Sequence, residues 1–426
     1  MQIRRVSVLV LALVSLSLVG SLQALAQEAP SLQAKDFVAV CGDSITEQRQ
    51  YSVFIEDYLL MCQPAADLRG MQAGWGGEVA PGFLSRMQRD VLALHPTVVT
   101  TCYGMNDGGY GPFDPNRGKL YRDTHKAIIA GLRDAGVRLI VIGSPGCVDS
   151  NTFRGGGQPA EVYNVTLGKL GDIGREVAAE EKVVFADVHT PMMEIMAKAK
   201  AKYGPTYHLA GPDGVHPSQN GQLVMAYAFL KALGCKGDVG TITLDLATGK
   251  AEATAGHKVL SSAGGVIEME STRYPFCFFG DPASPGATRG VIEFLPFNDE
   301  LNRLRLVVTG VEAAARYQVT WGQATKEFSG AALSQGINLA AEFLDNPFCG
   351  AFQTVERAIR QQQDFETPLT KMLLHNLPAY RDAAPDENAA LDRVAARVIA
   401  RDEALATASS AAVVPVKHTL KVETVR

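Results

Sequence analysis

Short apolar runs alternate with amphipathic stretches along residues 37–234. Four runs rich in β-branched residues cover 37–41, 97–102, 137–143 and 183–187, and a weaker run near 67–72 is the expected second strand. Segments between them, such as 82–95 and 120–136, carry apolar residues at helical spacing. Apolar strands that alternate with amphipathic helices indicate an α/β fold, in which a parallel sheet is covered by helices on both faces.

The pattern changes after residue 236. Residues 237–335 show alternating apolar and polar positions with many turn residues, which predicts a small antiparallel, sandwich-like β domain. From residue 336 the spacing becomes helical again, and the end of the chain could return to the β domain as an edge strand. The predicted division is therefore 1–26, 27–236, 237–335 and a helical region, 336–426, with a possible final strand. Tyr317 and Trp321 could be stacking platforms for a ligand, but aromatic residues in strands are more often core.

The first 26 residues are typical of an export signal. Arg4 and Arg5 precede an apolar stretch over 6–20, and Ala24 and Ala26 fit a small-x-small cleavage site. A membrane anchor is the alternative, but the apolar stretch is short for a bilayer span. We expect cleavage after Ala26, a periplasmic or secreted protein, and no integral membrane span afterwards.

Composition and residue spacing argue against several kinds of partner and ligand. The 426 residues carry a formal net charge of −5 and no basic stripe, so a nucleic-acid partner is not expected. The seven cysteines include no C-x-x-C pair, and their odd number leaves at least one thiol free. Cys41 and Cys102 each end an apolar run and are expected to be buried.

No H-E-x-x-H or other metal-ligand spacing occurs, so we predict neither a metal nor a cofactor. We expect His95, His125 and His189 to have structural rather than catalytic roles, whereas His208 could line a pocket.

Four polar clusters fall at junctions that are expected to face the same edge of the sheet. Ser44 follows the run 37–41 and precedes a helical pattern, so it is either a helix cap or a nucleophile. A glycine-rich loop occupies 74–78, Asn106 follows the run 97–102, and Asp213 stands three residues before His216. Together these supply a nucleophile, a base, an orienting carboxylate and oxyanion donors, which are the parts of an acyl-transfer site.

The serine is not in a G-x-S-x-G elbow, because Thr46 occupies the second glycine position. The four clusters, in their order along the chain, instead resemble the sequence blocks of the SGNH hydrolases, also called the GDSL esterase/lipase family. The resemblance covers residues 37–234 and implies a flavodoxin-like three-layer αβα domain. It implies a catalytic triad of Ser44, Asp213 and His216, and an oxyanion hole formed by Ser44, Gly77 and Asn106.

Two details of the resemblance stay open. Gly76 is the neighbouring candidate for the oxyanion glycine, although the spacing favours Gly77. The family often has asparagine two residues before the first loop glycine, where this chain has Gln72. Asp43 is expected to organise the turn before the serine and is not placed among the catalytic residues.

These observations predict an exported serine esterase that removes short acyl groups, with acetyl groups on a carbohydrate as the favoured substrate. Export and the appended β domain are the arguments for a carbohydrate. A lipase or lysophospholipase, a non-catalytic carbohydrate-binding protein, and an acyltransferase that uses a sugar acceptor are the alternatives. The oligomeric state is left open.

Overall fold

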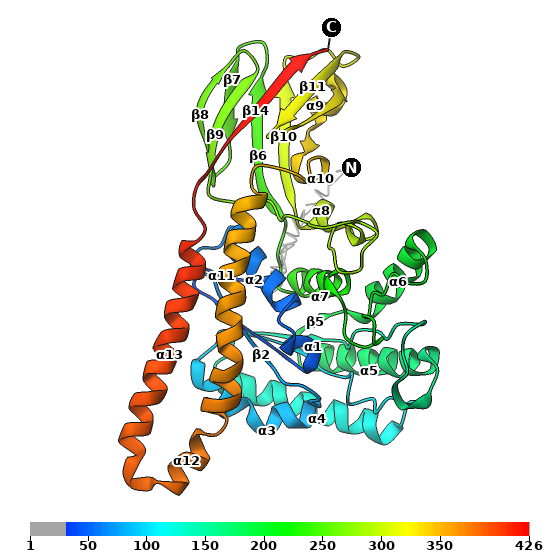
Figure 1. Ribbon diagram of the computed structural model, residues 1–426, viewed down its shortest axis with the longest axis vertical. Helices are drawn as coiled ribbons and strands as arrows, with labels where there is room; N and C mark the ends of the chain where they lie inside the picture. Colours follow the sequence, from blue (N-terminus) through cyan, green and yellow to red (C-terminus); the bar gives the residue numbers. More distant parts are fainter. Residues whose placement is uncertain (1–30, 426) are drawn as a thin grey trace, which may run out of the picture.

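A computed structural model describes residues 31–425, so the expected export signal lies outside the described residues. The N-terminal half is a three-layer domain around a parallel five-stranded sheet (Figure 1). Its strand order is β2-β1-β3-β4-β5, the doubly wound order of flavodoxin-like folds. The strands are β1 (Phe37–Gly42), β2 (Arg69–Gly74), β3 (Val98–Cys102), β4 (Leu139–Gly143) and β5 (Val184–Ala186).

Helices cover both faces of this sheet because successive strand residues point to opposite sides. In β1, Val38 and Val40 join one apolar cluster, whereas Ala39 and Cys41 join the other. The first face is covered by α2, α6 and α7, and the second by α3, α4 and α5. These helices and the short α1 span Ser44–Glu47 (α1), Tyr51–Met61 (α2), Ala80–Asp90 (α3), Pro115–Asp134 (α4), Ala160–Glu180 (α5), His189–Tyr203 (α6) and Gln219–Ala232 (α7).

The β-rich part is a sandwich of two sheets with orders β13-β10-β6-β7 and β12-β11-β14-β9-β8. Tyr317 and Trp321 are buried in it, which confirms the prediction that they belong to the core. Its strands are β6 (Asp238–Asp245), β7 (Lys250–Ala253), β8 (His257–Ala263), β9 (Val266–Ser271), β10 (Arg303–Thr309), β11 (Arg316–Trp321), β12 (Ala324–Ser329), β13 (Ile337–Asn338) and β14 (Val416–Thr424).

Two expectations about this sandwich are wrong. The sheets are not purely antiparallel, because β6 and β10 pair in parallel. The final strand β14 is not at an edge, since it lies between β9 and β11 and pairs with both. Its alternating pattern, with Leu420 and Val422 buried between exposed neighbours, is the same for central and edge strands of a sandwich. Hydrophobic alternation alone therefore could not place it.

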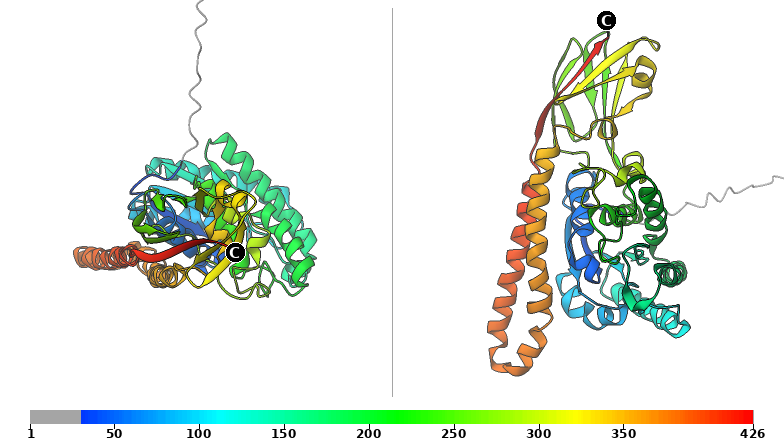
Figure 2. Two further views of the ribbon diagram at one scale, coloured as in Figure 1. Left: turned by 90° about the horizontal axis from the view of Figure 1, so that it is seen from above. Right: turned by 45° about the vertical axis from the view of Figure 1, so that its right-hand side comes forward.

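A long helical hairpin leaves the sandwich and returns to it. It runs along the side of the α/β domain, with α11 against α2 and β2, and α13 on the outside (Figures 1 and 2). Residues 336–426 thus contribute to both parts of the molecule. The hairpin and the remaining short helices are α8 (Phe297–Glu300), α9 (Gly330–Gln335), α10 (Leu339–Glu342), α11 (Cys349–Pro368), a π-helical segment (Leu369–Leu374), α12 (Leu377–Ala383) and α13 (Asn388–Ala411).

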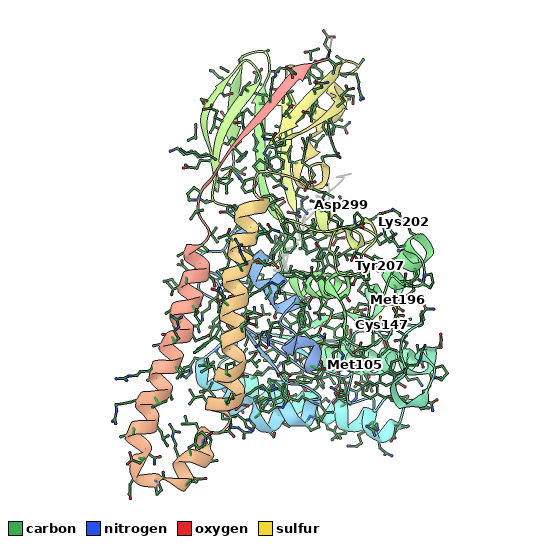
Figure 3. The ribbon with its side chains drawn as sticks, in the orientation of Figure 1. Met105, Cys147, Met196, Lys202, Tyr207 and Asp299 are labelled. Atoms are coloured by element: carbon green, nitrogen blue, oxygen red, sulfur yellow. The ribbon has the colours of Figure 1, made fainter. Side chains whose placement is uncertain are left out.

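The α/β domain and the sandwich share one apolar core. The segment between β9 and β10 carries Phe276 and Phe297 onto the first face of the α/β domain, where Phe276 meets Phe54 and Phe297 meets Tyr58. Met105 and Cys147, which follow β3 and β4 and are labelled in Figure 3, belong to this same cluster. The two parts are therefore packed together rather than linked by an open hinge.

All seven cysteines are free thiols, and only Cys349 is partly exposed. Cys41 and Cys102 are buried, as predicted. Within residues 31–425, no helix is both long and apolar enough to span a bilayer.

Candidate active site

Ser44 lies at the carboxyl end of β1, where it opens α1. Asp43 caps this helix by accepting the Ile45 N–H at 2.9 Å, so it organises the turn as expected. Gly42 lets α1 fold back onto the strand, because a Cβ there would lie 2.1 Å from the hydroxyl oxygen of Thr46. The close strand-to-helix turn holds the serine at the rim of the sheet.

His216 and Asp213 reach the same rim from the loop before α7. The Ser44 Oγ lies 2.8 Å from His216 Nε2, and His216 Nδ1 lies 2.6 Å from Asp213 Oδ2. The second oxygen of Asp213 accepts the backbone N–H groups of Val215 and His216, both at 2.9 Å. Partial burial alone would raise the pKa of Asp213, but these hydrogen bonds and the imidazole hold it below its usual value. Asp213 is thereby kept ionised against the histidine ring.

Two backbone N–H groups lie just beyond the carboxyl ends of β1 and β2. Among the described residues, neither the Ser44 N–H nor the Gly77 N–H has a hydrogen-bond partner. Gly77 has a φ of +72°, a conformation that other residues rarely adopt. The N–H of Gly76 is instead bound by the Glu47 carboxylate at 2.5 Å. Of the two glycines weighed from the sequence, Gly77 is the one with a free donor.

Asn106 is held by partners on both ends of its amide. Its Nδ2 donates to the Glu78 carbonyl at 3.0 Å, and its Oδ1 accepts the Tyr110 hydroxyl at 2.9 Å. These contacts settle which end of the amide is nitrogen and leave the second N–H unbound. Tyr110 has a φ of +57° and stacks on Tyr163 at 5.1 Å between ring centroids. Sequence reasoning missed Tyr110, because a tyrosine in a glycine-rich loop carries no signal of this role.

Buried carboxyl groups tie the loops beneath the site together. Asp107 accepts the N–H groups of Ala80 and Gly104, both at 2.9 Å, and so joins the loop after β3 to the start of α3. Burial, together with a smaller contribution from nearby carboxylates, raises the pKa of Asp107 to about 6 and that of Asp43 to about 7. The carboxylate of Glu78 is compensated by a two-pronged ion pair with Arg86.

The other histidines do not join this cluster. His125 is buried with Nδ1 against the Tyr121 carbonyl, and burial lowers its pKa to about 4. His189 Nδ1 contacts the Gly146 carbonyl, and His208 stays a candidate pocket residue near α7. Over residues 31–425, no three His, Cys, Asp or Glu side chains are grouped as metal ligands.

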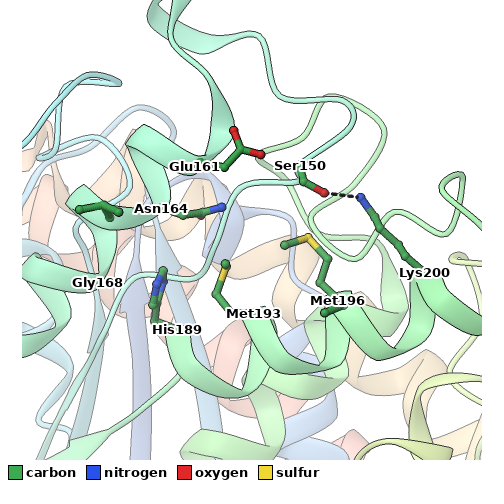
Figure 4. A pocket seen from close by; sticks show the side chains of 10 residues that line it. Ser150, Glu161, Asn164, Gly168, His189, Met193, Met196 and Lys200 are labelled. Carbon is green, nitrogen blue, oxygen red and sulfur yellow. Dashed lines mark hydrogen bonds between the residues drawn. The ribbon is translucent and has the colours of Figure 1, made fainter.

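A cavity of about 600 Å³ between α5 and α6 contains none of the predicted site residues. Met193, Met196 and Lys200 line it together with His189 (Figure 4). The loop that closes one side of this cavity touches the Asp213–His216 turn, because the Asp149 N–H donates to the Gly214 carbonyl at 2.9 Å. The cavity is thus a neighbour of the site, separated from it by that loop.

Comparison with known proteins identifies the domain that carries these residues. Residues 40–224 match the model of the GDSL-like lipase/acylhydrolase family. The chain carries a GDSL-like lipase/acylhydrolase domain. An acetylxylan esterase of Geobacillus stearothermophilus is 25% identical over 190 residues, which make up 43% of this chain and 80% of that enzyme. The GDSL-like domain makes this chain a carboxylic ester hydrolase.

One solved structure is similar in fold over most of this chain. A gut microbial diltiazem-metabolizing enzyme matches 93% of this chain and 99% of its own, with a TM-score of 0.71 and 23% identity. The acetylxylan esterase of Geobacillus stearothermophilus matches 48% of this chain and 96% of its own, with a TM-score of 0.40 and 22% identity. The first match extends well beyond the GDSL-like domain, so the sandwich and the helical hairpin occur with it in another protein.

Proposed function

We propose that the GDSL-like domain hydrolyses short acyl esters with Ser44 as the nucleophile. The observation that carries this proposal is the unbroken contact from Ser44 Oγ through His216 to Asp213, at 2.8 Å and 2.6 Å. A serine hydroxyl is a weak nucleophile unless a base removes its proton during attack. His216 is within reach to do so, and Asp213 holds its other nitrogen.

The reaction then follows in two stages. Ser44 Oγ attacks the ester carbonyl while its proton passes to His216 Nε2, and the alcohol leaves with that proton. Water next attacks the acyl-serine, gives a proton to His216, and releases the carboxylic acid as the proton returns to Ser44. Asp213 stays ionised throughout and stabilises the imidazolium that forms in each stage.

The negative oxygen of each tetrahedral intermediate needs donors on the side away from the histidine. We assign these donors to the N–H groups of Ser44 and Gly77 and to the free amide N–H of Asn106. All three lack another partner among residues 31–425, which supports the assignment. Donors fixed before the reaction stabilise the developing charge without reorganisation.

We infer that the substrate is a carbohydrate carrying short acyl groups, with acetyl favoured. The side chains of His216 and Asp213 are 31% and 54% exposed, so the alcohol side of the site is open to solvent. An open rim suits a bulky alcohol better than a long acyl chain, which needs an apolar channel. The acetylxylan esterase that resembles this domain supports the same substrate class.

Export is part of the same proposal. Arg4, Arg5 and the apolar stretch that follows support a signal that is cut after Ala26. Sequencing the amino terminus of protein recovered from the medium or periplasm tests this. A mature chain that begins at Gln27 is expected, whereas an intact amino terminus on membranes would make the stretch an anchor.

Acyl-chain selectivity is the decisive measurement. Purified protein and Ser44→Ala are compared on p-nitrophenyl acetate, p-nitrophenyl octanoate and acetylated xylan, with released acetate as the readout for the polymer. We expect acetate-selective hydrolysis that the variant lacks. A preference for octanoate would indicate a lipase or lysophospholipase. Inertness toward all esters and toward a serine-reactive phosphonate would indicate a binding protein, and acetylation of an added sugar would indicate a transferase.

A further inference from the structure

Helix α11, the first helix of the hairpin, lies beside β2 where a sixth strand would otherwise pair. As the edge strand of the sheet, β2 has backbone groups that no strand pairs. The Gln72 N–H donates to the Glu366 carboxylate at 2.7 Å, and Gln362 Nε2 donates to the Gly70 carbonyl at 3.0 Å. The Gly70 N–H is taken by Glu56 of α2 at 3.1 Å. Side chains of a helix that lies far along the chain thus complete the edge that leads to the glycine-rich loop 74–78, which we call the oxyanion loop.

The side chain of Gln72 continues this connection to the end of β2. Its Nε2 donates to the Thr367 hydroxyl at 2.8 Å, and its Oε1 accepts the Gly74 N–H at 2.9 Å. Gln72 is the residue that departs from the asparagine common in the family. Here the longer side chain spans from the last strand residue to the hairpin, which gives the departure a structural reason.

Beyond Pro368 the hairpin reaches the oxyanion loop itself. The π-helical segment presents Lys371 to Trp75, with Nζ 4.7 Å from a ring centroid, and His375 packs on the same indole at 4.7 Å. The Lys371 ammonium also lies 2.5 Å from Glu47 Oε1. Glu47 is three residues after Ser44, so this ion pair joins the hairpin to the helix that carries the nucleophile.

Glu47 also contacts the oxyanion loop. Its second oxygen accepts the Gly76 N–H at 2.5 Å, and Gly77 follows with its own N–H free. We propose that Lys371 is a positioning residue for ester hydrolysis: it holds the Glu47 carboxylate that fixes the oxyanion loop. This inference rests on the proposed function, because it concerns the donor that Gly77 supplies there.

The chain of contacts explains why Lys371 matters although it does not touch the substrate. Without its partner, the Glu47 carboxylate, which is 25% exposed, can turn to water and release the Gly76 N–H. A shift of about 1 Å in a catalytic donor costs up to about 100-fold in rate. The ground-state binding of a small ester does not use this donor, so the loss is expected in kcat rather than in KM.

Lys371→Met removes the charge and keeps the length of the side chain, and Lys371→Arg restores the charge. Lys326→Met is the matched control, because Lys326 pairs with Glu342 at 3.0 Å and lies over the Phe343 ring at 5.8 Å, inside the β-rich part. On p-nitrophenyl acetate we expect Lys371→Met to lower kcat about 10- to 100-fold with KM within about twofold. Lys371→Arg should recover most of the loss, and Lys326→Met should match the wild type.

Hydrogen exchange of the peptide over 72–79 gives a readout that does not depend on catalysis. We expect this peptide to exchange about tenfold faster in Lys371→Met than in the wild type or in Lys326→Met. Unchanged kcat and unchanged exchange would overturn the proposal, and so would an arginine variant as slow as the methionine variant. If wild type and Ser44→Ala were equally inactive, the proposed function would fail, while the exchange rates would still decide whether Lys371 holds the loop.

Discussion

Replacing Asn106 by alanine removes a donor from the oxyanion site, whereas replacing Tyr110 by phenylalanine removes only what orients that donor. Loss of an oxyanion donor costs about 2.7–4 kcal/mol of transition-state stabilisation, so Asn106→Ala should lower kcat by about 100- to 1000-fold. The Tyr110 hydroxyl makes one neutral hydrogen bond to Oδ1, at 2.9 Å. Such a bond is worth about 0.5–1.5 kcal/mol, so Tyr110→Phe should lower kcat by about two- to tenfold.

The two variants are compared on p-nitrophenyl acetate, with Ser44→Ala as the uncatalysed baseline. The phenylalanine ring keeps the stack on Tyr163, so the loop stays folded and the effect isolates the hydroxyl. KM should change little in either variant, because the donor acts on the charged intermediate and not on the bound ester. An Asn106→Ala enzyme within threefold of the wild type, or a Tyr110→Phe enzyme slower than Asn106→Ala, would refute the oxyanion assignment.

Three further substitutions test the scaffold. Burial raises the pKa of Asp43 from 3.8 to about 7. The folded protein therefore holds a proton that the unfolded chain releases, and stability should fall by up to about 4 kcal/mol as pH rises from about 4 to 7. Asp43→Asn should lose much of this dependence in thermal melts at pH 5 and pH 8, and an unchanged slope would contradict it. Leu420→Ala should lower the free energy of unfolding by about 2–5 kcal/mol in urea titrations, and exposed Thr419→Ala should not. Gly74→Ala places a Cβ 2.2 Å from the Glu47 backbone nitrogen, so kcat should fall while circular dichroism stays native. If Gly74→Ala kept the wild-type kcat, α1 would have to move away from the added Cβ without harm to the site.

The parallel sheet and the site at its edge follow from local sequence patterns. Each strand ends where a polar or glycine residue begins, and parallel strands bring all of these ends to one edge. This rule places Ser44 and Asn106 at one edge, whereas His216 reaches that edge from the loop between α6 and α7. The roles come from the family resemblance, and the structure adds the 2.8 Å contact between Ser44 Oγ and His216 Nε2.

The hairpin's part in the site could not be predicted in this way. Lys371 and Glu47 are 324 positions apart, and nothing in either neighbourhood marks them as partners. The alternation in β14 specifies a strand with one buried face but not its neighbours, which depend on how both sheets close. The parallel pairing of β6 with β10 likewise joins two strands that are far apart along the chain.

The central position of β14 has a consequence for how the molecule is made. The strand begins at Val416, whereas its partners β9 and β11 end at Ser271 and Trp321, about a hundred or more residues earlier. During synthesis these two strands wait without their common neighbour until the whole hairpin has emerged. The five-stranded sheet can close only after the hairpin has been made, so a chain cut short within the hairpin leaves two open strand edges.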